Sequence, residues 1–350
     1  MSGSDSPRSA PLRIAVDAMG GDHAPIEIVQ GAVLAARNDR DLHLLLVGRQ
    51  EDLERELGSI SAVPDRIELV HAPEVVTMDD TALSPLRRKK NSSIRICANL
   101  VAEERASAFV SAGNTGAAWT SARMVMGMIE GVSRPALATV LPRLQGETLL
   151  LDVGASVDSK PQHLREWAVM GHFYAQMLTG NPDPRVALLS IGEEEGKGNE
   201  VTRETYRVLK ATGLNFIGNA EGRDIYNGNA DVVVCDGFTG NVVLKASEAL
   251  AEMITRALRE ELMKTAMGRI GGLLSRGAYR NLRKRMDYAE YGGAPLLGVR
   301  GGCVICHGRS DRRAIKNAIR VARDFVANRI DEKIRKKITD LHAKELAEGL

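Results

Sequence analysis

The sequence is poor in aromatic residues and contains no run long and apolar enough for a membrane-spanning helix. Aromatic residues make up 4% of the 350 residues, and no apolar run reaches the roughly 18 residues that a span needs. Basic residues (47) nearly balance acidic ones (45), so the net charge of +2 creates no overall field for nucleic acid. Residues 1–11 lack the apolar core of a signal peptide. We therefore expect a disordered tail at 1–11 and a cytoplasmic globular protein.

The few cysteines do not suggest a disulfide framework. Cys97 and Cys235 lie in apolar runs, which indicates buried thiols in a reducing compartment. The segment from Cys303 to His307 matches the C-x-x-C-H pattern of haem attachment, but its apolar residues favour a buried strand. The same spacing would supply half a zinc site, for which no second pair of ligands is found. We expect no metal and no cofactor, and the role of Cys303 and Cys306 stays open.

Several fingerprints of common enzymes are also missing. Neither G-x-x-x-x-G-K-[ST] nor a G-x-G-x-x-G that opens the first helix is present. There is also no G-x-S-x-G elbow of the serine hydrolases. A covalent enzyme intermediate is therefore not favoured. A small bound nucleophile fits better, with the protein supplying orientation and charge stabilisation.

Short apolar segments alternate with helical patterns along most of the chain. Helical segments such as Ile26–Asn38 and Pro161–Leu178 separate strands that look buried on both faces. This alternation predicts an α/β fold with a mostly parallel sheet and helices on both faces, with any division into lobes near residues 110–150. An apolar stripe from Ile315 to Ile338 predicts one long packing helix. The expected strands are 12–18, 42–48, 66–72, 107–113, 148–154, 185–192, 230–237 and 302–308.

Polar, glycine-rich segments follow most of these strands and usually lead into a helix. Ligands of open α/β sheets bind at the carboxyl ends of the strands, where glycine lets backbone N–H groups approach an anion. The recurrence of such segments favours a phosphate-type anion site, although single glycine turns are common connectors. The candidate phosphate- or substrate-binding residues are Gly20, Gly21, Asp22, His23, Asn114, Thr115, Gly116, Asp152, Lys160, Thr239, Gly240 and His307.

Two residues in these segments are candidates for catalysis. Lys197 lies between Gly196 and Gly198 just before a helical pattern, so it is either an anion-binding cation or a solvated loop lysine. Asn241 stands at a helix start, where it is either a plain N-cap or a donor to the substrate. The two interpretations of Asn241 are compatible.

The motifs themselves resemble one family. AVDAMGGDHAP, RRKKNSS, SAGNTGA, LDVGASVDSKP, KGNE, DGFTGN and YGGAPLLG occur in this order between residue 12 and about residue 330. Together they resemble the bacterial phosphate acyltransferases of the PlsX family, although that family carries other residues where Cys303 and Cys306 stand. The resemblance implies a three-layer α/β/α fold similar to phosphotransacetylases and to isocitrate and isopropylmalate dehydrogenases. It also implies a homodimer and a single catalytic domain with a cleft over residues 12–350.

The resemblance also implies an activity. It is the transfer of a long-chain fatty acyl group from acyl carrier protein to inorganic phosphate, which yields acyl phosphate for phosphatidic acid and phospholipid synthesis. The family's catalytic lysine and asparagine fall on Lys197 and Asn241, with direct attack by bound phosphate and no cofactor. A phosphotransacetylase that uses a short-chain acyl-coenzyme A, a dehydrogenase of similar fold and a non-catalytic membrane-surface scaffold are the alternatives. The acyl chain length and the loops that hold phosphate and pantetheine stay open.

A basic, amphipathic segment is expected to form a helical hairpin over residues 250–288. Glycines at 271, 272 and 277 suggest breaks in the helix, and the apolar candidates for membrane contact are Met267, Ile270, Leu273 and Leu274. Such segments lie on anionic membranes, and packing in a dimer is the alternative. The resemblance favours peripheral membrane docking near a downstream glycerol-3-phosphate acyltransferase of the membrane. Between Leu262 and Met286 the charged residues are all basic: Lys264, Arg269, Arg276, Arg280, Arg283, Lys284 and Arg285.

A second basic cluster consists of Arg87, Arg88, Lys89 and Lys90. It is either a solvated helix face or a docking patch for the acidic acyl carrier protein. Nucleic acid is not an expected partner, because no aromatic residue is interleaved with either basic cluster.

Overall fold

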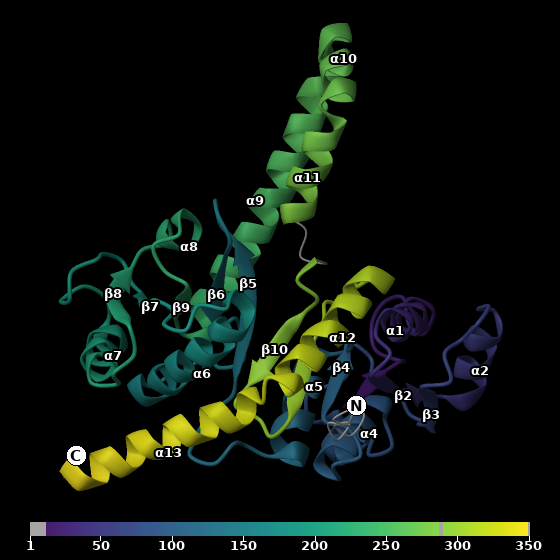
Figure 1. Cartoon of the computed structure of the whole chain (residues 1–350), viewed down its shortest axis with the longest axis horizontal. Coiled ribbons are helices and arrows are strands. Elements are labelled where there is room, and N and C mark those ends of the chain that lie inside the picture. Colours follow the sequence, from purple (N-terminus) through teal and green to yellow (C-terminus); the bar gives the residue numbers. More distant parts are fainter. Residues whose placement is uncertain (1–11, 287–289, 349–350) are drawn as a thin grey trace, which may run out of the picture. The chain divides into compact units, whose positions relative to one another are not determined.

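The computed structural model of the protein describes residues 12–286 and 290–348 (Figure 1). The chain divides into two compact units. Unit 1 contains the described residues up to Gly127 together with Arg300–Asn328, and unit 2 contains Met128–Val299 together with the described residues from Arg329 onward. The first boundary lies within the range of residues 110–150 that the sequence indicated. Each unit is built around its own set of strands.

Unit 1 contains five parallel strands in the order β3-β2-β1-β4-β11. The side chains of Ile14, Val16 and Leu44 share one face of this sheet and pack against α1 and α12. α4 packs against the same strands. The strands are β1 (Leu12–Asp17), β2 (Leu42–Gly48), β3 (Ile67–His71), β4 (Ala108–Ser111) and β11 (Gly302–Ile305). The helices are α1 (Ile26–Asn38), α2 (Gln50–Gly58), α3 (Ser84–Arg87), α4 (Ser93–Ala102), α5 (Thr115–Ser121), the π-helix η1 (Ala122–Met126) and α12 (Arg312–Ala327).

Unit 2 contains strands in the order β10-β5-β6-β9-β7-β8, of which β5 runs antiparallel to both its neighbours. α6 packs closely on this sheet, since a Cβ at Gly171 would lie 2.7 Å from Val232 and 2.8 Å from Leu151. The strands are β5 (Ala136–Pro142), β6 (Glu147–Leu151), β7 (Val186–Leu189), β8 (Phe216–Ala220), β9 (Val232–Val234) and β10 (Ala294–Leu297). The helices are α6 (Pro161–Thr179), α7 (Glu200–Lys210), α8 (Asp224–Asn227), α9 (Gly237–Lys264), α10 (Ala266–Leu274), α11 (Arg276–Met286) and α13 (Ile330–Glu348).

The mostly parallel α/β architecture confirms the prediction, and α1 has the predicted bounds. The prediction of one long C-terminal helix is wrong. α12 ends at Ala327 and α13 begins at Ile330, because Arg329 takes a left-handed conformation with φ of +51°. Strands β5, β8 and β10 were not predicted. The antiparallel pair of β5 and β6 is therefore a feature that strand–helix alternation does not indicate.

α9, α10 and α11 form the helical hairpin of unit 2 and extend away from its sheet (Figure 1). The chain reverses at Thr265, which has extended backbone and caps α10 by accepting a hydrogen bond from Gly268 N. α11 then runs beside α9, with the hydroxyl group of Tyr279 donating to the carbonyl of Thr255 at 3.2 Å. The predicted break at glycines 271 and 272 is wrong, since both lie within α10. None of the described helices is long and apolar enough to cross a membrane.

Candidate functional site

Lys197 lies in the loop that connects β7 to α7 in unit 2, and its neighbours fix the path of this loop. Gly198 has φ of +102°, and a Cβ there would lie 2.1 Å from Thr202 Oγ1. Only glycine fits such a close approach with this backbone conformation. Asn199 caps α7, because its Oδ1 accepts a hydrogen bond from Thr202 N at 2.9 Å. The KGNE motif thus places Lys197 immediately before the start of a helix.

Lys197 is exposed, and no described residue engages its ammonium group. The acids that precede it bind other cations: Glu193 pairs with Arg223 and Glu195 pairs with Lys210, each at 2.8 Å. Lys197 itself makes no side-chain hydrogen bond or ion pair with the residues that the structure describes. Its charge is therefore free to bind an anion from solution.

The DGFTGN motif forms the start of α9. Asp236 is the N-cap, and its carboxylate accepts hydrogen bonds from Thr239 N at 2.9 Å and from Thr239 Oγ1 at 2.6 Å. Asn241 lies inside the first turns of the helix and is exposed, so the suggestion that it is the N-cap is wrong. The Thr239 hydroxyl already donates to Asp236. Because Asp236 caps the helix, the side-chain amide of Asn241 is not used as a cap.

Two glycines of this motif let α9 approach the loop that follows β6. A Cβ at Gly240 would lie 1.9 Å from the carbonyl oxygen of Asp152, and one at Gly237 would lie 2.5 Å from that of Ser156. Gly237 N donates to the same Ser156 carbonyl at 2.9 Å. As a result, Asn241 lies beside Gly154 of this loop. A Cβ at Gly154 would lie 3.8 Å from the side-chain amide carbon of Asn241.

Asp152 holds this loop in place. Its buried carboxyl group accepts hydrogen bonds from the backbone N–H groups of Leu137 at 2.9 Å, Ala155 at 3.0 Å and Ser156 at 2.7 Å. Burial raises the pKa of Asp152 to about 6, although these hydrogen bonds act to lower it. Asp152 is thus a positioning residue for the loop, and its predicted contact with substrate stays a prediction.

Lys197 and Asn241 belong to the same edge of the unit 2 sheet. β6, β9 and β7 are neighbouring parallel strands, and Val234 of β9 pairs with Leu151 on one side and Leu188 on the other. The loops that follow these strands therefore begin at one level, as expected for a ligand site of a parallel sheet. Lys160 is exposed at the start of α6, after the β6 loop, where its backbone N–H donates to His163 Nδ1 at 3.1 Å.

A second group of candidate residues lies in unit 1, at the carboxyl ends of β1, β4 and β11. A Cβ at Gly20 would lie 2.6 Å from Asp17 Oδ2 and 2.7 Å from Gly113 N. Asp17 is buried, which raises its pKa, and it accepts a hydrogen bond from Ser111 Oγ at 2.6 Å. Close packing of these loops thus explains why Gly20 has to be a glycine.

The next residues of the β1 loop meet the loop after β11. Asp22 N donates to the carbonyl oxygen of Gly308 at 2.8 Å, and Gly21 also lies against this carbonyl. His23 and His307 are both exposed. His307 Nδ1 accepts a hydrogen bond from Arg309 N at 3.2 Å. Within unit 1 the structure therefore brings the Gly20–His23 and His307 segments together.

Asn114 serves the fold of unit 1. Its Oδ1 caps α5 by accepting from Ala117 N at 3.0 Å, and its amide group donates to the carbonyls of Met78 at 3.2 Å and Asp80 at 3.0 Å. Thr115 is exposed, whereas a Cβ at Gly116 would lie 2.9 Å from the side chain of Ala82. A role in phosphate binding for Asn114, Thr115 and Gly116 stays a prediction.

The basic cluster of residues 87–90 is divided between a structural lysine and exposed cations. Lys89 is half-buried, and its ammonium group lies 2.5 Å from Asp80 Oδ2 and 2.8 Å from the carbonyl of Val75. The hydrogen bond from Lys89 lowers the pKa of Asp80 to about 2. Arg87, Arg88 and Lys90 are exposed.

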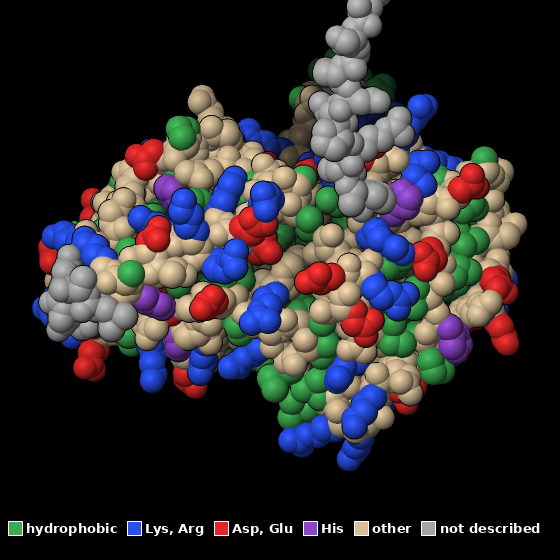
Figure 2. Space-filling view, turned by 60° about the horizontal axis from the view of Figure 1, so that its bottom comes forward, with side chains coloured by type: hydrophobic (Ala, Val, Ile, Leu, Met, Phe, Trp, Pro, Cys, Tyr) green, Lys and Arg blue, Asp and Glu red, His purple; other side chains and the backbone are tan. Residues whose placement is uncertain are grey.

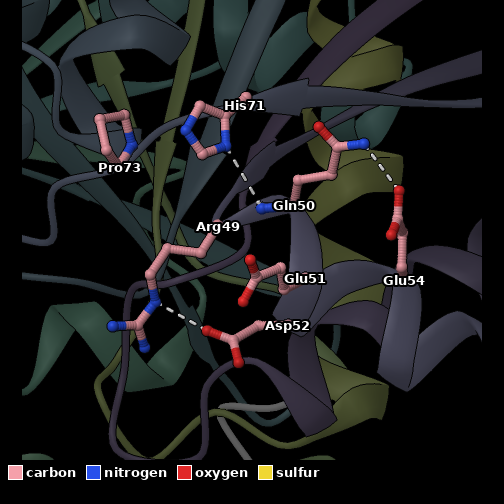
Figure 3. Close-up of a pocket in the computed structure, with 7 residues that line it drawn as sticks. All are labelled: Arg49, Gln50, Glu51, Asp52, Glu54, His71 and Pro73. Atoms are coloured by element: carbon pink, nitrogen blue, oxygen red, sulfur yellow. Dashed lines mark hydrogen bonds and ion pairs between the residues drawn. The ribbon is translucent and has the colours of Figure 1, made fainter.

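A polar cavity of about 700 Å³ lies at the carboxyl ends of β2 and β3 in unit 1 (Figure 3). Its side chains pair with one another: Arg49 Nε with Asp52 at 2.7 Å, and Gln50 Nε2 with Glu54 at 2.7 Å. No pattern in the sequence indicates it, because no glycine-rich motif follows either strand. With three acids in the lining, it does not suit an anion. The lining residues are Arg49, Gln50, Glu51, Asp52, Glu54, His71 and Pro73.

The cysteines do not supply a reactive thiolate. All four are free and buried, and burial raises the pKa of Cys306 to about 12 and that of the other three as well. Cys303 lies in β11, and Cys306 directly follows it. Both side chains are buried, which agrees with the predicted buried strand. Among the described residues, no group of His, Cys, Asp and Glu side chains is arranged to hold a metal ion.

Comparison with known proteins gives the family. The family model described as a fatty acid synthesis protein matches residues 12–333. A phosphate acyltransferase of Pelotomaculum thermopropionicum is 53% identical over 333 residues, which cover 95% of this chain and 97% of that protein. One of Pelobacter propionicus is 51% identical over 335 residues, covering 96% of each.

Solved structures support the same fold. A phosphotransacetylase of Streptococcus pyogenes superimposes with a TM-score of 0.62 at 16% identity, covering 90% of this chain and 94% of that chain. A branched-chain phosphotransacylase of Enterococcus faecalis has a TM-score of 0.55 at 15% identity, covering 90% and 99%. The predicted likeness to the phosphotransacetylase fold is thereby confirmed. From the sequence matches, the chain belongs to the phosphate acyltransferase family and is an acyltransferase.

Proposed function

We propose that this enzyme transfers a long-chain fatty acyl group from acyl carrier protein to inorganic phosphate, which gives acyl phosphate for phospholipid synthesis. The observation that carries the proposal is the ammonium group of Lys197, which no described residue engages, at the edge of the sheet where Asn241 is exposed. The family's name supports phosphate as acyl acceptor, and the description of its model as a fatty acid synthesis protein supports a fatty acyl donor.

The proposed reaction is a direct attack without a covalent enzyme intermediate. An oxygen of phosphate forms a bond to the thioester carbonyl carbon, and the carbon–sulfur bond then breaks. The leaving thiolate takes up the proton that the attacking phosphate loses. Lys197 neutralises phosphate charge and orients it for attack. Asn241 donates an amide N–H to the developing oxyanion or to the phosphate.

The partners of the reaction are further parts of the proposal. The acidic carrier docks on the exposed cations Arg87, Arg88 and Lys90, while Lys89 shapes the segment from within. The enzyme acts as a homodimer that associates peripherally with the membrane, where the downstream acyltransferase receives its insoluble product. Over most of the face drawn in Figure 2, basic and acidic side chains are interspersed.

The first test measures phosphate-dependent release of free carrier from palmitoyl-acyl carrier protein, with acetyl-coenzyme A as a parallel donor. The wild-type enzyme should release carrier and form acyl phosphate. Lys197→Ala and Asn241→Ala should each lower turnover about 100-fold or more, the usual loss when one charge-stabilising donor is removed. Lys336→Ala is the matched control, because it removes an exposed lysine of α13 in the same unit.

Other outcomes would redirect the assignment. Turnover of acetyl-coenzyme A alone would make the enzyme a short-chain phosphotransacetylase. Full activity in folded Lys197→Ala and Asn241→Ala variants would remove both residues from the mechanism. No turnover of any acyl thioester would favour the membrane-surface scaffold.

A further inference from the structure

Three large apolar side chains of unit 2 are exposed just after the carboxyl ends of its parallel strands, two in loops and one in the first turn of α9. Val157 follows β6, Ile191 follows β7 and Phe238 follows β9. Their exposed fractions are 63%, 81% and 63%. Single exposed apolar residues are common on protein surfaces. Here three of them follow neighbouring parallel strands of one sheet, at the edge where ligands of such sheets bind.

The strand register starts the three segments that carry these residues at one level. Leu188 pairs with Val234 in parallel, and the chain reaches Ile191 and Gly237 three residues after these two partners. Phe238 follows Gly237 directly. Gly237 N donates a hydrogen bond to the carbonyl of Ser156. Phe238 and Val157 directly follow these two residues, so their backbones lie close together.

Each apolar residue is also a neighbour of the proposed catalytic machinery. Phe238 precedes Asn241 by three residues on α9, and this spacing puts the two side chains on the same face of the helix. Ile191 precedes Gly192, where a Cβ would lie 3.1 Å from Cγ of Lys197. Val242, which follows Asn241, is also more than half exposed.

We infer that Val157, Ile191 and Phe238 form an acyl-binding ledge that begins beside the thioester carbonyl, extends along the acyl chain and gives the enzyme a preference for acyl groups long enough to cover it. This inference rests on the proposed function. In the reacting complex the thioester carbonyl must lie beside Lys197 and Asn241, and the acyl chain begins one bond from that carbonyl. Apolar carbons therefore have to lie within a few bond lengths of this edge, where phosphate gains nothing from apolar side chains.

The acyl-binding ledge predicts how kcat/KM depends on the length of the acyl chain. Burying one methylene group in an apolar environment raises an association constant about fourfold. kcat/KM should therefore rise with each methylene that the ledge covers and level off once the chain extends beyond it. Removing part of the ledge should lower kcat/KM for donors long enough to cover it and leave very short donors nearly unaffected.

The test is a series of acyl-acyl carrier protein donors from butyryl to palmitoyl, assayed for phosphate-dependent release of carrier. Phe238→Ala, Ile191→Ser and Val157→Ser should each lower kcat/KM for palmitoyl about tenfold or more. The butyryl value should change by less than about threefold, because its two methylene groups cover only the start of the ledge. Leu144→Ser is the matched control: it removes an exposed leucine from the turn before β6, at the opposite edge of the same sheet.

The outcomes separate the ledge from the proposed function. Equal losses on short and long donors, or no loss on either, would overturn the acyl-binding ledge while the activity stands. A wild-type enzyme that turns over none of these donors would overturn the proposed function and the ledge with it. Light scattering on each variant adds a further check: a change of oligomeric state with unaltered chain-length preference would show that a second copy of the chain covers these residues, against the proposal.

Discussion

At the residue scale, burial of the Asp152 carboxyl group couples its protonation to the stability of the folded protein. Its folded pKa of about 6 lies above its ordinary value of 3.8 because of burial. Between these two pH values the folded state binds more protons than the unfolded state, so stability falls as pH rises. The contribution is fully present below about pH 4 and is lost as pH rises through about 6.

We predict that the free energy of unfolding contains a component of about 3 kcal/mol that disappears between pH 4 and pH 7. Asp152→Asn cannot ionise and should lack this component, although it should be less stable overall by about 1–3 kcal/mol because its amide group faces a backbone donor. Urea unfolding of both proteins across this pH range measures the difference. Asp158→Asn, in an exposed part of the same loop, should keep the wild-type dependence. Parallel curves for wild type and Asp152→Asn would contradict the prediction.

At the scale of elements, the α9–α11 hairpin presents apolar side chains at its tip next to basic ones. Met267, Leu273 and Leu274 of α10 are 76%, 69% and 82% exposed. Arg276 and Arg280 of α11 make no ion pair with the described residues, whereas the side chain of Arg283 lies outside them. Exposed apolar groups beside unpaired cations are the combination that binds anionic membrane surfaces.

We predict that the double variant Leu273→Ser, Leu274→Ser sediments with anionic phospholipid vesicles at least about tenfold more weakly than wild type, since each leucine loses its burial in lipid. Both residues are exposed, so its thermal unfolding should be unchanged. Ile217→Ser, an exposed apolar residue of β8, is the control and should bind vesicles like wild type. Equal sedimentation of double variant and wild type would mean that the tip does not contact lipid.

At the scale of the whole molecule, α9 carries an apolar stripe that the described residues do not cover. Leu250, Ile254 and Leu258 recur at four-residue spacing, with Met253 beside them, and all are substantially exposed. Such a continuous stripe on a long helix is typical of a surface that another helix covers. It supports the proposal of a homodimer in which α9 meets its counterpart.

We predict a dimer mass for wild type in multi-angle light scattering and a monomer mass for Leu250→Lys, Ile254→Lys, because two lysines in a facing pair would be buried without partners. Glu252→Lys introduces the same charge on the opposite side of α9 and should remain dimeric. A monomeric wild-type protein would contradict the proposed homodimer. A dimeric double variant would show that the dimer interface does not include this stripe of α9.

The parallel strands, the helix Ile26–Asn38 and the motifs that carry Lys197 and Asn241 could all be predicted from the sequence alone. Buried parallel strands are continuous apolar runs, and a helix start that approaches another loop closely needs glycine. Both features are therefore visible as short local patterns in the sequence. The family resemblance rests on the same local patterns. The fold class and the type of enzyme are therefore evident in the order of the residues.

Tertiary contacts, by contrast, settle which residues use their side chains for the fold. Asp236 rather than Asn241 caps α9, Lys89 neutralises Asp80, and Asp152 holds the β6 loop. The antiparallel β5 and the end of α12 at Ala327 were likewise not evident in the pattern. These outcomes depend on partners distant in sequence, and no local period or propensity records which hydrogen bond or close contact a residue will make once the chain has folded.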